Sequence, residues 1–331
     1  MRRRELITLI GGAAVAWPLA AHAQRSEQTR RIGVLMGYAE SDPEGQVRVG
    51  AFREGLQRLG WEEGRNIRID TRWATPGDAE LRQRFAQELV SLQLDLILSH
   101  GTPSTAALLP QTRTIPILFA GVSDPVGSGF VASFPRPGGN VTGFITMEPT
   151  MSGKWLELLK EIAPDIARVA LLFNPVTAPY VEYWLGPFKA AAASFGLEAI
   201  VAPVRDTSEL ESVTATLARE PNGGLIAIPD TFLAAHRAEV TSLAARYRLP
   251  AVYGFRYFPN VGGLMSYGSD QIDDYRRAAI YADRIFKGTK PSELPVQTPV
   301  KFELVINVKT AKALGLVIPQ AVLARADEVI E

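Results

Sequence analysis

The sequence has 331 residues, of which 47% are hydrophobic, with 35 basic side chains, 35 acidic side chains and no cysteine. The balanced charge provides no electrostatic footprint for nucleic acid or for an anionic membrane surface. The lack of cysteine excludes disulfides and thiolate metal sites. A chain of this length and apolar content is sufficient for two ordinary domains.

Residues 1–23 have the features of a secretory signal peptide. Three arginines at 2–4 precede an apolar stretch over residues 6–20, and the tripeptide AHA ending at Ala23 fits a cleavage site. The apolar stretch is too short and too interrupted to be a membrane anchor. We therefore expect cleavage after Ala23 and a periplasmic protein, with Sec and twin-arginine export both left open. Removing the three arginines and Glu5 leaves 32 basic and 34 acidic residues, a net charge of about −2.

Strand-like and helix-like segments alternate through the first half of the mature chain. The segments RIGVLM, NIRIDTRWA, DLILSH and IPILFA are predicted strands. Helices are predicted over residues 46–59 and 79–92 and, as a short turn or two, near Thr105. Continuous apolar strands separated by helical periods are typical of a parallel sheet that is covered on both faces.

The second half repeats this order. RVALLFNP resembles RIGVLMGY, GLIAIPDT resembles DLILSHGT, and LPAVYGF resembles IPILFAG. Helices are predicted over residues 155–163 and 233–248. Three matching strand pairs in one order favour two lobes of the same architecture, with a single large sheet as the alternative. Two lobes imply a cleft between them.

Three segments rich in glycine and proline are candidates for chain crossings between the lobes. They cover residues 135–149, 259–270 and 295–307. Each alone could be a surface loop, but together with the repeated lobes they indicate a hinge. The expected division is a signal peptide at 1–23, a first lobe of 31–145 plus 266–297, and a second lobe of 146–265 plus 298–331.

Long stretches of the chain resemble a known family. The segments IPILFAGVSDPVGSGFVASFPRPGGNVTGF, GGLMSYGSD, YRRAAIYADRIFKGTKPSELPVQTPVKFELVIN and KTAKALGLVIPQAVLARADEVIE are similar to a proteobacterial branch of the ABC transporter substrate-binding family, which includes tryptophan- and tyrosine-binding lipoproteins. The resemblance implies an α/β fold of the type I periplasmic binding proteins, with two similar doubly wound parallel-sheet lobes joined by a three-segment hinge. It also implies a solute-capturing protein that serves an ABC permease in the inner membrane. There is no lipobox cysteine, so we expect a free periplasmic protein, acting as a monomer.

Candidate ligand contacts follow from the position of loops at the carboxyl ends of parallel strands. The resemblance implies contacts from the loops beyond the first, third and fourth strands of each lobe. Gly101, Thr102, Ser104 and Thr105 are predicted to hold a carboxylate at a helix N-terminus. The alternative is that Ser104 or Thr105 only caps its helix.

Asp230, after the matching strand of the second lobe, suits a ligand ammonium group, or it serves only as a helix N-cap. The aromatic candidates for stacking on a ligand are Tyr38, Tyr180, Phe232 and Phe255, each of which could also be ordinary packing. The loop residues Ser123 and Asn174 complete the expected site. Asp124, beside Ser123, is expected to fix its turn rather than to bind ligand.

Catalytic and cofactor motifs are absent from the sequence. The mature chain has only two histidines, His100 and His236, and contains no H-E-x-x-H, G-x-S-x-G or P-loop pattern. His100 could face the cleft, but it is expected to be a satisfied histidine at a strand end. The favoured function is capture of an amino acid or related carboxylate for ABC import, without a cofactor or a metal. An extracytoplasmic sensory module and a secreted enzyme are the alternatives.

Overall fold

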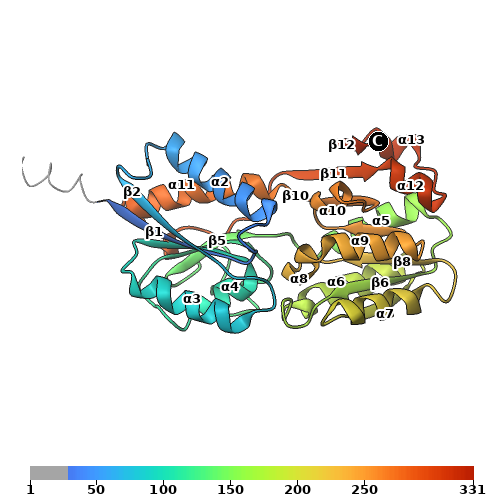
Figure 1. The fold of residues 1–331 in the computed structure, drawn as a ribbon, viewed down its shortest axis with the longest axis horizontal. Helices are drawn as coiled ribbons and strands as arrows, with labels where there is room; N and C mark the ends of the chain where they lie inside the picture. The colour runs from blue at the N-terminus through green and yellow to red at the C-terminus, as the bar shows by residue number, and fades with distance from the viewer. Residues whose placement is uncertain (1–28) are drawn as a thin grey trace, which may run out of the picture.

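The computed structural model describes residues 29–331, so the predicted signal peptide lies outside the described residues. Figure 1 shows two lobes side by side, each a sheet covered by helices. The two sheets have five and seven strands. The predicted architecture of two similar α/β lobes is confirmed, and the alternative of one large sheet is wrong.

The first lobe has an all-parallel sheet in the order β2-β1-β3-β4-β5. Its central strands are apolar throughout because helices cover both faces. The strands are β1 (Arg30–Met36), β2 (Ile67–Trp73), β3 (Leu96–His100), β4 (Ile117–Val122) and β5 (Val141–Ile145), and the helices are α2 (Pro43–Arg58), α3 (Ala79–Ser91), α4 (Gly101–Leu108), α11 (Gln271–Phe286) and the 3-10 turn η2 (Pro291–Glu293).

The second lobe repeats this order as β7-β6-β8-β9-β10 and adds β11 and β12, with β11 antiparallel to β10. The strands are β6 (Arg168–Phe173), β7 (Glu198–Pro203), β8 (Gly223–Ala227), β9 (Ala251–Tyr253), β10 (Met265–Ser269), β11 (Phe302–Asn307) and β12 (Glu328–Ile330). The helices are α5 (Met151–Ile162), α6 (Val181–Ser194), α7 (Thr207–Leu217), α8 (Thr231–Ala235), α9 (Arg237–Arg246), α10 (Tyr257–Asn260), α12 (Val308–Leu314) and α13 (Gln320–Leu323).

Two details of the second lobe differ from the sequence prediction. The helix expected over 233–248 is two helices, α8 and α9, separated at His236, whose backbone angles are not helical. β7 had not been predicted. It is an edge strand with mostly exposed or half-buried residues, so it has no continuous apolar run to reveal it.

The chain passes between the lobes at three neighbouring places. The crossings follow β5, follow β10 and precede β11, and they are hydrogen-bonded to one another. Ser269 Oγ donates to the carbonyl of Thr146 (2.9 Å), and the Asp270 N–H donates to the carbonyl of Lys301 (3.0 Å). Lys301 Nζ also pairs with the Asp270 carboxylate at 2.7 Å.

The second crossing lies at the end of the segment predicted for it, residues 259–270, and after the expected lobe boundary. The expected boundary was at 265/266, after the paired glycines Gly262 and Gly263. These glycines instead lie just before β10, which stays in the second sheet through Ser269. The chain therefore leaves the second lobe near Asp270.

Helix α11 returns to the first lobe and packs closely on α2. The contact depends on Gly55, where an added Cβ would lie 2.7 Å from Ala279 Cβ and 3.1 Å from the Arg276 carbonyl oxygen. Gly50, on the same helix, has no heavy atom within 4 Å of such a Cβ.

These two glycines give a matched test of helix packing. Gly55→Ala should destabilise the protein by about 1–3 kcal/mol, because the extra methyl group forces α2 and α11 apart. Gly50→Ala should be neutral or stabilising by up to about 1 kcal/mol, because alanine has the better helix propensity. Urea denaturation of both variants measures the difference, and equal effects would contradict the proposed close packing.

Candidate ligand-binding cleft

The carboxyl ends of both sheets border one inter-lobe cleft. In each sheet, the first and third strands of the lobe lie side by side at the switch point of the strand order, which is where ligands bind in open parallel sheets. The residues lining the cleft come from both lobes: Tyr38, His100, Gly101, Thr102, Gly121, Thr146, Tyr180, Pro229, Asp230, Thr231, Ala234, Phe255, Tyr257 and Gln271.

The lobes are close together in this structure. The open volume in the cleft is about 20 Å³, which is room for about one water molecule. A contact across the cleft brings Thr231 of the second lobe against Gly101 of the first, where an added Cβ would lie 3.5 Å from Thr231 Cγ2. The cleft in this arrangement has no room for a molecule the size of an amino acid.

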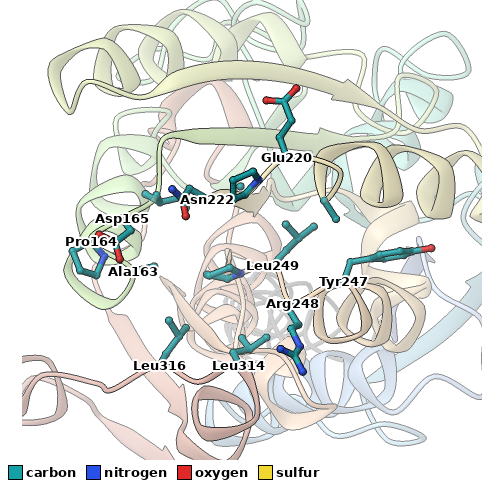
Figure 2. A pocket seen from close by; sticks show the side chains of 15 residues that line it. Ala163, Pro164, Asp165, Glu220, Asn222, Tyr247, Arg248, Leu249, Leu314 and Leu316 are labelled. Atoms are coloured by element: carbon teal, nitrogen blue, oxygen red, sulfur yellow. The ribbon is translucent and has the colours of Figure 1, made fainter.

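A larger cavity of about 360 Å³ lies elsewhere in the second lobe (Figure 2). Its walls are the loops before β6, β8 and β9, together with Leu314 and Leu316. It is therefore at the amino ends of the strands, the edge opposite the switch point. We take the cleft as the candidate site because only the cleft joins the switch points of both sheets.

His100 is one of the residues of the first-lobe wall. Its ring lies 4.8 Å from the Tyr38 ring, and its Nδ1 is hydrogen-bonded to the Tyr275 hydroxyl at 2.7 Å. Burial, together with the nearby Arg48 guanidinium, lowers the pKa of His100 to about 3, so the imidazole is neutral at physiological pH. The sequence prediction of a satisfied histidine is consistent with this pairing, but the ring also borders the cleft.

Only two of the four residues predicted to hold a carboxylate line the cleft. Gly101 and Thr102 line it, whereas Ser104 and Thr105 do not. The Thr102 hydroxyl is bonded to both backbone groups of Ser123, and the Thr105 hydroxyl is bonded to Ser99 Oγ (2.8 Å). Ser104 Oγ is buried without a hydrogen-bond partner among the described residues. Neither Ser104 nor Thr105 caps α4, whose N-terminus has no side-chain cap.

Asp230 lies at the second-lobe wall and also caps α8. Its Oδ1 accepts from the Phe232 N–H (2.7 Å) and the Thr177 hydroxyl (2.5 Å), and its Oδ2 accepts from the Asn174 N–H (2.5 Å). Burial raises the pKa of Asp230 to about 6, although these hydrogen bonds oppose the shift.

The aromatic candidates divide into two groups. Tyr180 and Phe255 line the cleft with Tyr38, and the Tyr180 hydroxyl donates to the Pro229 carbonyl at 2.6 Å. Phe232 does not line it and instead packs on His236, with 4.5 Å between ring centroids.

The remaining loop residues, Asn174, Ser123 and Asp124, make hydrogen bonds that hold the loops around the cleft. Asn174 Oδ1 accepts from the Val176 N–H at 2.8 Å and so holds the turn after β6. Ser123 Oγ is bonded to Thr146 Oγ1 at 2.9 Å, which joins the ends of β4 and β5. Asp124 accepts from the Gly127 N–H at 2.7 Å, the turn-fixing contact expected of it.

Several cleft residues were not anticipated from the sequence. Thr146 and Gln271 follow β5 and β10, the strands that lead into the crossings, and Tyr257 begins α10 after β9. The predicted crossings between the lobes could have indicated Thr146 and Gln271, because segments that cross at the edge of a cleft must border the cleft. Gly121, with a φ of 73°, leaves room for the His100 ring and the Gln271 amide.

Charged and aromatic side chains also join the lobes beside the cleft. Arg237 of α9 forms a bidentate pair with the Asp42 carboxylate, at 2.9 and 3.2 Å. Arg48 of α2 is buried with its guanidinium 5.7 Å from the Tyr257 ring centroid. These contacts require the lobes to be close.

The model of the ABC transporter substrate binding protein family matches residues 39–330. The chain belongs to this family. Among residues 29–331, no helix is sufficiently long and apolar to cross a membrane, and no cluster of three or more histidine or acidic side chains could hold a metal ion.

Three relatives are similar to this protein over most of its length. A tyrosine-binding protein of Clostridioides difficile is 27% identical over 80% of this chain and 75% of its own length. A Streptococcus pneumonia ABC domain solved in complex with L-Trp is 27% identical, covers 92% of this chain and 100% of its own, and has a TM-score of 0.84. A ligand-free, open substrate-binding protein with adhesive properties from Clostridium difficile is 25% identical, with coverages of 91% and 99% and a TM-score of 0.68.

Proposed function

We propose that this protein captures an amino acid or a related carboxylate in the periplasm and delivers it to an ABC permease of the inner membrane. Ligand binding drives closure of the two lobes, and the closed form is the one that the permease engages. The protein acts as a monomer and performs no chemistry on its ligand. The observation that carries the proposal is a cleft whose polar and aromatic walls come from both lobes at the switch points of their sheets.

The comparisons support closure as the working motion. The relatives in the L-Trp complex and in the open state have nearly the same identity to this chain, yet their TM-scores differ, at 0.84 and 0.68. We attribute this contrast to a difference in lobe arrangement, with this chain in the closed form. A ligand that touches both walls gains contacts only on closure and therefore favours the closed population.

The cleft has the chemistry of a site for an aromatic or apolar amino acid. Asp230 is an acceptor for an ammonium group on one wall, and the opposite wall is at the α4 N-terminus, where free N–H groups favour an anion. Tyr38, Tyr180 and Phe255 can pack on a side chain between them. L-Tryptophan and L-tyrosine, the ligands named for two relatives, are therefore the first probes to titrate. Saturable one-to-one binding is expected by isothermal titration calorimetry.

The affinity should fall as the pH decreases from 7.5 to 5. Asp230, with its pKa of about 6, is ionised above this value and loses its attraction for a ligand ammonium below it. The predicted loss is about tenfold at pH 5. His100 does not contribute in this window because its pKa is about 3, and Asp274, whose burial raises its pKa to about 8, stays mostly protonated.

Asp230→Asn is the matched variant for this pH dependence. It should bind more weakly at pH 7.5, because the ammonium loses its counter-charge, and its affinity should be nearly constant from pH 5 to 7.5. Circular dichroism checks that the α8 cap survives the change. The same tenfold decline in the variant would contradict the ammonium role of Asp230.

The Arg237–Asp42 pair should favour the closed form. Both side chains are only about one-seventh exposed, at 15% and 13%, so their attraction is less screened than that of a surface pair. Arg237→Gln should weaken ligand binding about three- to tenfold and increase the radius of gyration of the ligand-free protein. Calorimetry and small-angle X-ray scattering measure the two effects.

Arg246→Gln is the control for this experiment. Arg246 lies on the same helix, α9, but its partner Glu211 belongs to the same lobe and both are exposed. The control should leave affinity and radius of gyration unchanged. An equal response of the two variants would show that the Arg237 pair has no particular role in closure.

A further inference from the structure

Gln271, the first residue of α11, places an amide group at the cleft wall. The residue is 8% exposed and lines the cleft beside Gly121, where an added Cβ would lie 3.8 Å from Gln271 Nε2. Gln271 Oε1 accepts hydrogen bonds from Arg48 Nε (3.1 Å) and from Arg48 Nη2. Within residues 29–331, Gln271 Nε2 donates to no acceptor.

Arg48 determines which end of this amide faces the cleft. A guanidinium has only donors, so the amide must turn its oxygen to Arg48 and its NH₂ group away from it. Arg48 is itself held in place: its Nη1 donates to the Glu44 carbonyl (2.6 Å) and carboxylate (2.8 Å), and its guanidinium lies between the rings of Tyr38 and Tyr257. The amide cannot flip while these contacts persist.

His100 lines the same wall, and one of its ring nitrogens is paired within the first lobe. Its Nδ1 lies 2.7 Å from the Tyr275 hydroxyl, whose other neighbour is the weak acceptor Met36 Sδ at 3.9 Å. Burial raises the pKa of Tyr275, so the phenol keeps its proton and donates it to Nδ1. The neutral imidazole then carries its own proton on Nε2, between the ring carbons that approach Gly37 and Gly121.

We propose that Gln271 is a specificity-determining residue of the cleft and that Arg48 positions it, so that the first-lobe wall selects ligands bearing a carboxylate at this point. The inference rests on the proposed function and specifies the group that the first lobe recognises. The wall presents the Gln271 NH₂ group beside the His100 ring, whereas Asp230 on the opposite wall is an acceptor. A zwitterionic amino acid therefore binds in one orientation, with its carboxylate toward α11 and its ammonium toward α8.

The test compares ligands that differ only in the carboxylate. L-Tryptophan and tryptamine, and likewise L-tyrosine and tyramine, are titrated calorimetrically into the wild type and into Gln271→Leu and Gln271→Glu. Gln271→Leu should lose at least tenfold in affinity for the amino acids and less than threefold for the amines. Gln271→Glu should lose more for the amino acids, because its carboxylate pairs with Arg48 and repels the ligand carboxylate. Gln57→Glu, an exposed change of the same charge on α2, is the control.

Arg48→Met tests the positioning role separately. Without the guanidinium the amide can rotate and present its oxygen, so discrimination between an amino acid and its carboxamide, such as L-tryptophan and L-tryptophanamide, should fall at least fivefold. A structural role alone would weaken both ligands equally and leave this ratio unchanged. Thermal unfolding of each variant confirms that it is folded.

The outcomes separate the two proposals. Equal losses for amino acid and amine in both Gln271 variants, or no loss in either, would overturn the role of Gln271. An unchanged ratio in Arg48→Met would overturn its positioning role. A wild-type protein that binds none of the probes would instead overturn the proposed amino-acid ligand and, with it, this inference.

Discussion

Three stretches of backbone join the lobes at one edge, and this constraint decides which residues can meet in the cleft. The crossings near Thr146, Asp270 and Lys301 are hydrogen-bonded to one another, so they can bend only together. Because each lobe has the same strand order, the crossings bring the switch points of both sheets to one cleft. The proposed closure is then a rotation about this edge that leaves both sheets intact.

Each wall of the cleft is preorganised within its own lobe. The Asp230 carboxylate is held by backbone and hydroxyl donors of the second lobe, and the Gln271 amide is held by Arg48 of the first. If these side chains touch the ligand as proposed, they need little reordering when it binds, which reduces the entropic cost of binding. In the proposed closure, a contact between the lobes such as Arg237 with Asp42 then biases the open and closed populations without building the site.

The sequence predicted the fold well wherever a strand is buried on both faces. β1, β3, β6 and β8 are continuous apolar runs, and their order revealed the repeated lobes. The edge strand β7 escaped prediction because its pattern is mostly exposed or half-buried. The boundary near Asp270 was misplaced because paired glycines mark a turn as readily as a crossing.

The site was predicted by position along the chain but not by side-chain direction. Loop residues such as Tyr38 and Asp230 line the cleft as predicted from their positions. The Thr105 hydroxyl does not, because a buried hydroxyl requires a hydrogen-bond partner and this one is bonded to Ser99 inside the lobe. The pairing of Arg48 with Gln271 joins residues 223 positions apart and has no local signal.

The central claim, that ligand shuts two hinged lobes, is most directly tested by a distance measured between them. The chain has no cysteine, so a variant carrying Arg84→Cys on α3 and Lys189→Cys on α6 can be labelled only at these exposed positions. Single-molecule energy transfer should show a longer and a shorter inter-lobe distance in the free protein, with the shorter one dominant at saturating L-tryptophan or L-tyrosine. A distribution that stays the same while calorimetry reports binding would contradict the account.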